Sequence, residues 1–143
     1  MTQIDFYVLG ENVPGNRFTL ACRLAEKAWQ QGRRVYLHTD SDADSSHLDR
    51  LLWTYRDGSF LPHGLAGQAD PAFNPILIGN AEHAGEEHDV LVNLASEVPD
   101  FFSRFDRVLE PLDADAGVRS AGRKRYSFYR ERGYRLSSHD IRK

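Results

Sequence analysis

A repeated pattern decides the fold, and it begins with the stretch Ile4-Asp5-Phe6-Tyr7-Val8-Leu9, a short apolar run that ends at Gly10. Such a run predicts a buried β-strand. Asn16 follows as a side chain that can cap a helix, and Gly32 is placed to end that helix. Between them, apolar residues recur at helical spacing: Phe18, Cys22, Ala25, Ala28 and Trp29.

The same alternation continues along the chain. Strands are expected at 34–39, 75–79, 89–94 and 105–110, a second helix starts at Asp44, a short helical turn covers 100–103, and a final helix over 114–132 ends at Gly133. Apolar strands that alternate with amphipathic helices indicate βαβ units. We therefore expect a single α/β domain over residues 1–143, a three-layer, doubly wound, mainly parallel sheet of Rossmann-like type. Residues 57–74 form a loop longer than most connections in a compact domain.

Composition narrows the class of protein. No apolar run approaches the roughly 18 residues that cross a bilayer, and the first residues lack the layout of a signal peptide. The only cysteine, Cys22, has no partner for an internal disulfide and lies on the apolar side of the first helix. These features favour a cytoplasmic protein without a membrane contact.

The charges are distributed unevenly. Residues 119–143 hold nine Lys or Arg and two acidic residues, whereas the remaining 118 residues hold nine Lys or Arg and nineteen acidic residues. An acidic body with a basic end argues against general coating of nucleic acid and predicts one local site for an anionic partner. The alternative is that the basic residues only make the C-terminal helix soluble and bind no partner.

The final helix carries the sharpest pattern. Arg119, Arg123, Tyr126 and Arg130 are spaced by four, three and four residues, so they fall on one side of a helix, which we call the basic row. Its expected core side holds Val118, Ala121 and Phe128. Guanidinium groups beside an aromatic ring suit a short acidic peptide with an apolar end. Single-stranded nucleic acid is the alternative ligand.

The turn after the first strand resembles a phosphate-binding loop in the spacing of Gly10 and Gly15. Asn16 and Arg17 stand where that loop needs Lys and then Ser or Thr, and Pro14 has no backbone N–H to donate. Nucleotide hydrolysis is therefore not expected, although a nucleotide- or phosphate-binding enzyme that uses this turn remains the alternative function. The scattered histidines and the single cysteine predict neither a catalytic group nor a metal centre.

Large apolar residues gather after the second helix. Phe60, Pro62 and Leu65 lie on a loop rich in proline and glycine that follows Trp53. Loops run over the surface, so this segment is a candidate protein-binding patch. The alternative is that the loop folds back and buries Phe60 and Leu65.

Three stretches together resemble a known family. They are the pattern Trp53…Phe60-x-Pro62-His63-x-Leu65-Ala66-Gly67, the helix-to-strand passage at 25–35, and the run from Arg123 to Arg130 that is followed by Gly133-Tyr134. Over nearly the whole chain the sequence is similar to the chi subunit of bacterial DNA polymerase III.

The resemblance implies a non-catalytic accessory subunit of the clamp-loader complex that needs no cofactor. In that family, chi pairs with the psi subunit, and a separate surface binds the acidic C-terminal tail of single-stranded DNA-binding protein, which ends in Pro-Phe. Contact with DNA is then mainly indirect. The fold is of the nucleotide-binding type but has no working nucleotide site.

The family's binding residues can be placed on this sequence. The tail-binding surface corresponds to Arg119, Arg123, Tyr126, Gly133 and Tyr134, with Arg130 as a further member of the row. The psi-binding surface corresponds to Trp53, Phe60, Pro62 and Leu65, with His63 at its rim. Two positions depart from the family pattern, since Ser127 replaces a basic residue and Glu110 falls near an apolar one. Arg125 or Arg130 is expected to compensate.

Overall fold

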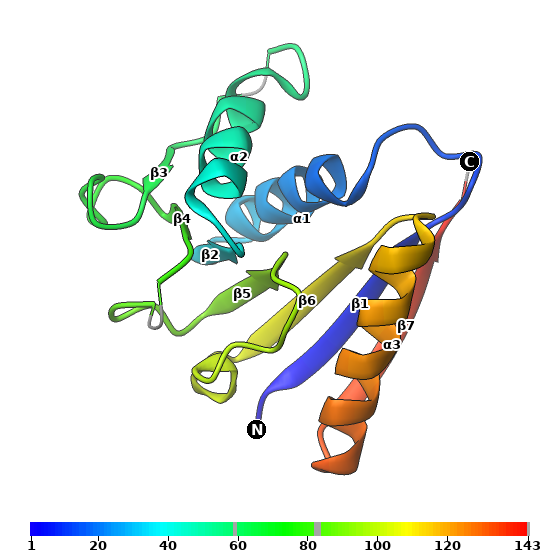
Figure 1. The fold of residues 1–143 in the computed structure, drawn as a ribbon. Helices are drawn as coiled ribbons and strands as arrows, with labels where there is room; N and C mark the ends of the chain where they lie inside the picture. The colour runs from blue at the N-terminus through cyan, green and yellow to red at the C-terminus, as the bar shows by residue number, and fades with distance from the viewer. Residues whose placement is uncertain (59, 82–83, 143) are drawn as a thin grey trace.

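The structure is a computed structural model that describes residues 1–58, 60–81 and 84–142. Its elements follow one another along the chain as β1 Gln3–Leu9, α1 Arg17–Gln30, β2 Val35–His38, α2 Asp42–Thr54, β3 His63–Leu65, β4 Ile76–Gly79, β5 Val90–Asn93, the 3₁₀ turn η1 Phe102–Arg104, β6 Arg107–Leu112, α3 Ala116–Glu131 and β7 Arg135–Ile141 (Figure 1). Within these ranges, none of the helices is long and apolar enough to span a membrane.

The strands of the described chain form one sheet in the order β3-β4-β2-β5-β6-β1-β7. Every pairing in it is parallel. All carboxyl ends therefore meet at one edge of the sheet, where α/β folds commonly bind ligands. The edge strands β3 and β7 stand at opposite sides of the molecule (Figure 1).

The two faces of the sheet bury two separate cores, because successive strand residues point to opposite faces. On β2, Val35 and Leu37 face the core beneath α1 and α2, whereas Tyr36 faces the core beneath α3 and η1. Figure 1 shows α3 lying along β1 and β7, away from α1 and α2. This arrangement confirms the expected three-layer α/β fold.

Helix α1 begins as the sequence predicted. The Asn16 side chain accepts hydrogen bonds from the backbone N–H groups of Phe18 and Thr19, and the Thr19 hydroxyl accepts one from the Asn16 N–H. This reciprocal capping box satisfies donors that the first turn leaves free. Cys22 is fully buried in the core, and burial raises its pKa to about 12.

Some boundaries differ from the expected ones. Helix α2 begins at Asp42, two residues before the expected start, because the Ser41 hydroxyl caps it by accepting a hydrogen bond from the Asp44 N–H. Strand β6 begins two residues later than the run at 105–110 suggested. The loop expected over 57–74 contains β3, three residues that hydrogen-bond to β4 and are too few to show an alternating pattern.

Strand β7 was missed altogether. It pairs with β1 in parallel from Gln3 and Arg135 to Leu9 and Ile141, although all of its side chains are exposed or half-buried. An edge strand of this kind is held mainly by backbone hydrogen bonds, so it carries little of the apolar pattern on which a sequence-based prediction depends. The basic end of the chain therefore combines the helix α3 with an edge strand.

A glycine sets how closely α3 approaches the sheet. A Cβ atom at Gly122 would lie 2.7 Å from Cδ1 of Leu112 on β6, which is closer than carbon atoms pack. Gly122 is buried, together with Arg125 and Tyr129 one turn and two turns further on. The missing side chain thus lets the helix rest directly on β6.

Candidate functional site

The side of α3 that faces the sheet is only partly the predicted one, although Val118 and Phe128 do pack against the core. Its buried residues are Gly122, Arg125 and Tyr129, whereas the residues expected to face the core are only half-buried: Val118, Ala121 and Phe128. The helix is therefore rotated relative to the expectation. An arginine occupies the centre of the buried side.

The basic row lies on one flank of α3. Arg123 and Arg130 are exposed, and Tyr126 is half-buried with its ring centroid 5.2 Å from that of Phe6. The guanidinium carbon of Arg130 lies 6.0 Å from the centre of the Tyr126 ring, within the range of a cation–π contact. The row therefore presents an anchored aromatic ring between two solvent-facing cations.

Arg119, the first member of the row, has a different environment. Its Nε donates to the carbonyl oxygen of Asp113 at 2.9 Å, and its Nη2 donates to the carbonyl oxygen of Leu9 at 3.0 Å. These bonds join the first turn of α3 to the carboxyl end of β1. Arg119 thus positions the helix.

Gly133 and Tyr134 lie at the carboxyl end of α3. Gly133 is exposed and has a φ of +80°, a left-handed conformation that ends the helix as predicted. The Tyr134 ring packs edge-on against Phe102, with centroids 5.1 Å apart. Tyr134 therefore contributes to the core contact of this end and lies at the margin of the row.

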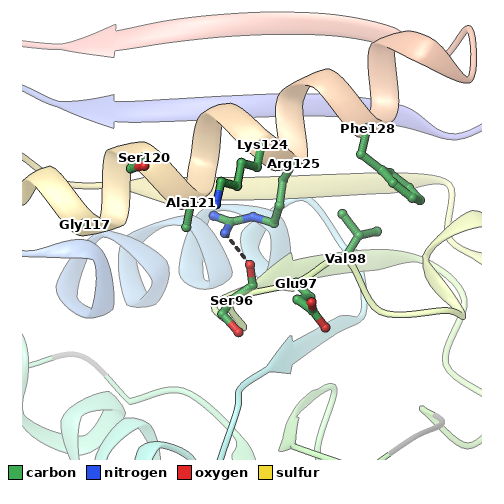
Figure 2. A pocket seen from close by; sticks show the side chains of 9 residues that line it. All are labelled: Ser96, Glu97, Val98, Gly117, Ser120, Ala121, Lys124, Arg125 and Phe128. Atoms are coloured by element: carbon green, nitrogen blue, oxygen red, sulfur yellow. Dashed lines mark hydrogen bonds between the residues drawn. The ribbon is translucent and has the colours of Figure 1, made fainter.

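The opposite flank of α3 borders a groove that the sequence did not reveal. Its volume is about 650 Å³, and it is lined by Ser96, Glu97, Val98, Gly117, Ser120, Ala121, Lys124, Arg125 and Phe128. Figure 2 shows the lining residues of α3 on one side and Ser96, Glu97 and Val98, from the segment that follows β5, on the other. Lys124, the neighbour of Arg123 in the sequence, is exposed on this flank.

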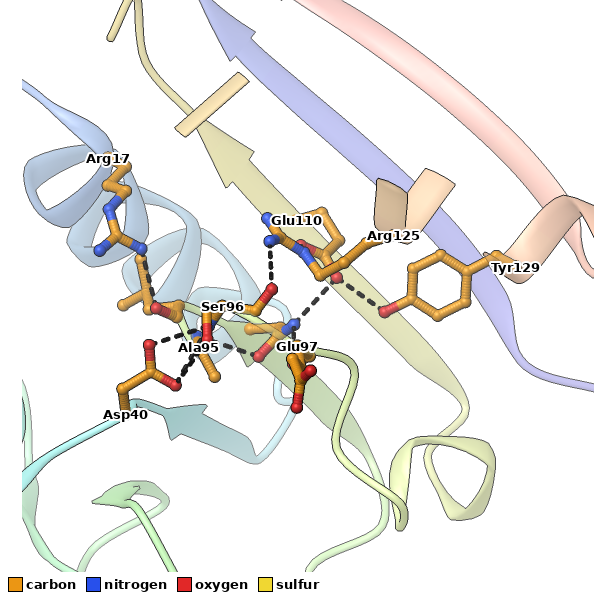
Figure 3. Close-up of polar contacts among 10 residues, drawn as sticks. Arg17, Asp40, Ala95, Ser96, Glu97, Glu110, Arg125 and Tyr129 are labelled. Carbon is orange, nitrogen blue, oxygen red and sulfur yellow. Dashed lines mark hydrogen bonds and ion pairs between the residues drawn. The ribbon is translucent and has the colours of Figure 1, made fainter. Parts of the chain in front are cut away.

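Beneath α3 lies a buried network of Glu110, Arg125 and Tyr129 (Figure 3), and Asn93 is its fourth member. Glu110 Oε1 accepts a hydrogen bond from Arg125 Nε at 2.9 Å, and its Oε2 accepts bonds from the Tyr129 hydroxyl at 2.7 Å and from Asn93 Nδ2 at 3.0 Å. Burial, together with the nearby Glu110 carboxylate, raises the pKa of Tyr129 far above its ordinary value. Tyr129 is therefore a neutral donor.

The network also fixes the segment after β5. Arg125 Nη1 donates to the carbonyl oxygen of Ser96 at 2.9 Å, and the Ser96 N–H donates to the Asp40 carboxylate at 2.9 Å (Figure 3). Arg17 adds a bond from its Nη1 to the carbonyl oxygen of Leu94 at 2.8 Å. Helix α3, the end of β5 and the end of β2 are thus tied together.

This network overturns one expectation. Arg125 is occupied by Glu110 and Ser96 and does not replace a missing surface cation. Glu110, which falls near an apolar position of the family pattern, is fully buried under α3. Two features of the sequence could have revealed this network. One is a carboxylate within an apolar strand run, and the other is an arginine four residues before a tyrosine on the same side of a helix. Ser127 is half-buried.

An apolar patch of Trp53 and Phe60 lies at the other edge of the sheet. Trp53 is 50% exposed and Phe60 is 73% exposed, and their rings meet edge-on with centroids 5.4 Å apart. The alternative in which the loop buries Phe60 is therefore wrong, and Leu61 is the buried residue instead. Two adjoining exposed rings are typical of a protein-binding surface.

The other residues expected near Phe60 support this patch from below. The His63 ring packs on Trp53 with centroids 4.6 Å apart, while its Nδ1 and Nε2 lie 2.6 Å and 3.0 Å from the carbonyl oxygens of Leu61 and Asp49. Its side chain is buried, so His63 holds Trp53 in place and offers no free ring nitrogen. Pro62 and Leu65 are half-buried.

The turn between β1 and α1 has no open phosphate cradle. The Arg17 N–H donates to the Asp113 carboxylate at 2.9 Å, and Asn16 uses the next two N–H groups. An anion of the protein itself thus occupies the position at the helix N-terminus that a phosphate would take. In the described ranges, no cluster of three or more His, Cys, Asp or Glu side chains could hold a metal ion.

Comparison with known proteins agrees with this geometry. Residues 1–137 match the family model described as "DNA polymerase III chi subunit, HolC". The chain is 45% identical to the DNA polymerase III subunit chi of Pseudomonas aeruginosa over 99% of its own length and 98% of that protein. It is 31% identical to the Haemophilus influenzae subunit chi, covering 96% of each chain, and 27% identical to the Escherichia coli one, covering 96% and 97%. The chain therefore belongs to the DNA polymerase III chi subunit family, and it acts in DNA replication as a subunit of the polymerase, not as an enzyme by itself.

Proposed function

We propose that this chi-family chain is a docking adaptor that links the clamp loader, through the psi subunit, to the acidic C-terminal tail of single-stranded DNA-binding protein. The basic row receives the tail, and the apolar patch receives psi. Replication takes place in the cytoplasm at the nucleoid, and the proposal places the chain there.

The observation that carries the tail-binding part is the arrangement of Arg123, Tyr126 and Arg130. Two exposed guanidinium groups flank a ring that is anchored on Phe6. Arginine pairs with carboxylates through charge-assisted hydrogen bonds, and an anchored ring offers an apolar surface to a terminal phenylalanine at little entropic cost. A short peptide with carboxylates and a terminal apolar residue matches both features.

The apolar patch supports the second half of the proposal. Trp53 and Phe60 expose large rings beside one another, and exposed aromatic groups in contact are enriched where proteins bind proteins. The patch belongs to α2 and the loop before β3, whereas the basic row belongs to α3 beside β7 (Figure 1). Because these elements stand at opposite edges of the sheet, both partners can bind at once.

Direct binding of bare single-stranded DNA is less well supported. Only one half-buried ring of the row, Tyr126, faces solvent between the arginines, whereas strand-binding sites stack several bases on successive rings. The acidic body of the chain also repels a long polyanion. A short tail reaches the row without crossing that body, so contact with DNA is mainly indirect.

Tethering explains how a modest affinity suffices. A chain that holds psi and a tail simultaneously raises the local concentration of the clamp loader at coated template, although each single contact is weak. Because the tail is captured by arginine–carboxylate pairs at the surface, its affinity falls as salt screens them.

A bridging experiment tests the adaptor. Psi is immobilised, the chain is added, and capture of single-stranded DNA-binding protein is followed with and without its C-terminal tail. We expect capture that depends on both the chain and the tail. Tyr126→Ala abolishes capture of the tail and leaves the psi complex intact, because the row and the patch are separate.

Two outcomes contradict the adaptor. If single-stranded DNA-binding protein without its tail is captured equally well, the basic row does not bind the tail. If binding of the tail and of psi exclude one another, the two partners share a surface, and the two-surface arrangement is wrong.

A further inference from the structure

Strand β7 is the last strand of the sheet and has a neighbouring strand on one side only. It pairs with β1 over the seven residues Arg135–Ile141, and no strand of the described chain lies along its outer edge. Figure 1 shows it at the margin of the molecule. The opposite edge strand, β3, is only three residues long. Among the described residues, β7 therefore forms the longer open edge of the sheet.

One backbone hydrogen bond shows which groups of β7 point outward. The Gly10 N–H donates to the carbonyl oxygen of Ile141 at 2.9 Å, so the backbone of Ile141 faces β1. Along a strand, the backbone groups of successive residues point to opposite edges. The N–H and C=O groups of Leu136, Ser138 and Asp140 therefore point away from the sheet. These donors and acceptors have no partner within the described chain, and they are the groups with which an added strand would pair.

Strand β7 has few of the features that usually keep a further strand away from an edge. It contains neither proline nor glycine, and its register with β1 runs without a bulge. Its three charged or titratable side chains are exposed: Arg135, His139 and Asp140. The protection that remains is charge, and charge excludes some partners while it attracts others.

The charge of this edge selects the kind of strand that can lie there. Residues 119–143 hold nine Lys or Arg against two acidic residues, and one of these, Asp140, is paired with Arg142 at 3.5 Å. A second copy of the chain would bring an equally basic edge and would be repelled. An acidic peptide is attracted to the same edge, so it is the favoured occupant.

The basic row lies on the side of α3 that faces this edge. The other flank of α3 borders the segment after β5, and the sheet order β5-β6-β1-β7 therefore places β7 on the side of the row. Tyr126 of the row packs on Phe6, and Phe6 is paired with Ser138. A strand added about 4.8 Å outside β7 lies on the same side of α3 as the exposed Arg123 and Arg130.

We propose that β7 binds the acidic tail as an additional β-strand. The inference rests on the proposed function and adds that the backbone of the tail pairs with the outward groups of Leu136, Ser138 and Asp140. Proline has no N–H, so the pairing uses the acidic residues that precede the terminal Pro-Phe. Main-chain hydrogen bonds contribute to the affinity, and the carboxylates on one face of the added strand lie toward the arginines of the basic row.

Backbone-modified peptides test the proposal on the full chain. The probe is a run of aspartates followed by Pro-Phe, and each modified version carries one N-methyl group at a successive aspartate. The N-methyl group removes one backbone donor and keeps the charge of the peptide. In an added strand every second N–H faces β7, so calorimetry should show affinity lowered about fivefold or more at alternate positions and less than about twofold at the positions between them.

Two substitutions of Ser138 form a matched pair. Ser138→Pro removes the outward N–H, and an edge strand tolerates proline where this group faces solvent. Ser138→Ala removes only the hydroxyl. We expect Ser138→Pro to weaken binding of the unmodified probe about fivefold or more and Ser138→Ala less than about twofold. Both variants should unfold within a few degrees of the wild type. If Ser138→Pro does not fold, the peptide series on the wild-type chain still decides the question.

The outcomes separate this inference from the proposed function. If the unmodified probe binds but the N-methyl groups have no effect or the same effect at every position, the added strand is wrong and the proposed function stands. If the unmodified probe does not bind, the proposed function itself fails. Light scattering of the free chain checks the other occupant, since a dimer that Ser138→Pro dissociates would assign the edge to a second copy and overturn the proposal.

Discussion

Glu110 and Arg125 form an ion pair inside the protein, with Arg125 Nε 2.9 Å from Glu110 Oε1 and side chains that are 0% and 6% exposed. Two charges at this depth must compensate one another, because each alone would lose its hydration without replacement. The pair lies directly beneath the helix that carries the basic row. Arg125 anchors α3 from below, while Arg123 two residues earlier faces solvent.

Removing one charge of this pair should destabilise the protein strongly. In Arg125→Met, the Glu110 carboxylate stays buried without its cation, so we expect a loss of about 3–5 kcal/mol in the free energy of unfolding. Denaturation by urea, followed by circular dichroism, measures the change. Tyr129→Phe is the matched control, because it removes one hydrogen bond to the same carboxylate and should cost only about 1.5–3 kcal/mol. If Arg125→Met lowers the free energy of unfolding less than Tyr129→Phe does, the ion pair is not the contact that holds α3 on the sheet.

Two neighbouring cations on α3 should differ in their effect on the tail. Arg123 belongs to the basic row and Lys124 to the opposite flank, and both are exposed. We expect Arg123→Ala to weaken binding of an acidic peptide that ends in Pro-Phe by about tenfold, the loss of roughly one charge-assisted hydrogen bond, and Lys124→Ala to weaken it less than twofold. Calorimetry at low and at high salt measures both. Equal losses of peptide affinity in the two variants would mean that binding depends on the net charge of α3 and not on the position of Arg123 in the basic row.

Two exposed phenylalanines allow a similar comparison for psi. Phe60 is 73% exposed beside Trp53, and Phe73 is 77% exposed on the loop before β4. We expect Phe60→Ala to lower affinity for psi by at least about 2 kcal/mol, as for an aromatic anchor at the centre of an interface, with a change of stability below about 1 kcal/mol. Phe73→Ala should leave the complex unchanged. Affinity lost equally in both variants would argue against a local patch, as would loss of tail binding in Phe60→Ala.

The ion pair of Arg33 and Asp89 should make stability depend on pH on the acid side. Burial alone would raise the pKa of Asp89, but bonds from the Arg33 side chain at 2.6 Å and from the Arg34 N–H at 3.0 Å outweigh it, so the pKa is lowered. A lowered pKa in the folded state stabilises the protein above the unfolded value of about 3.9, and this contribution disappears as pH falls through the folded value.

Asp89→Asn tests this expectation, since it keeps an oxygen that accepts from Arg34. We expect the variant to be less stable than the wild type at pH 7, with a difference that shrinks toward about pH 3. Urea midpoints at the two pH values measure it. A difference that stays constant with pH would show that the charge of Asp89 contributes nothing to stability.

The sequence predicted the elements that bury apolar residues. The strand at β1, the Asn16 cap and the glycine end of α3 could be predicted, because each depends on residues close together in the chain. The sequence left open whether Phe60 is exposed or buried, and only the structure decided that it is exposed. Strand β7 could not be predicted from the sequence, since its pairing with β1 depends on backbone groups more than 130 residues away. The roles assigned to the basic row and the apolar patch stay predictions.

By itself, the sequence determined the parallel α/β fold, the family and the spacing of the basic row, because hydrophobic period and residue order are properties of the chain alone. Only the tertiary structure decided which polar atoms meet: Glu110 with Arg125, Asp113 with the start of α1, and the Tyr36 hydroxyl with no partner in the described chain. The reason is physical. Each of these environments is set by the rotation of a helix and by the register of distant strands. The local spacing of apolar residues predicts neither the rotation nor the register.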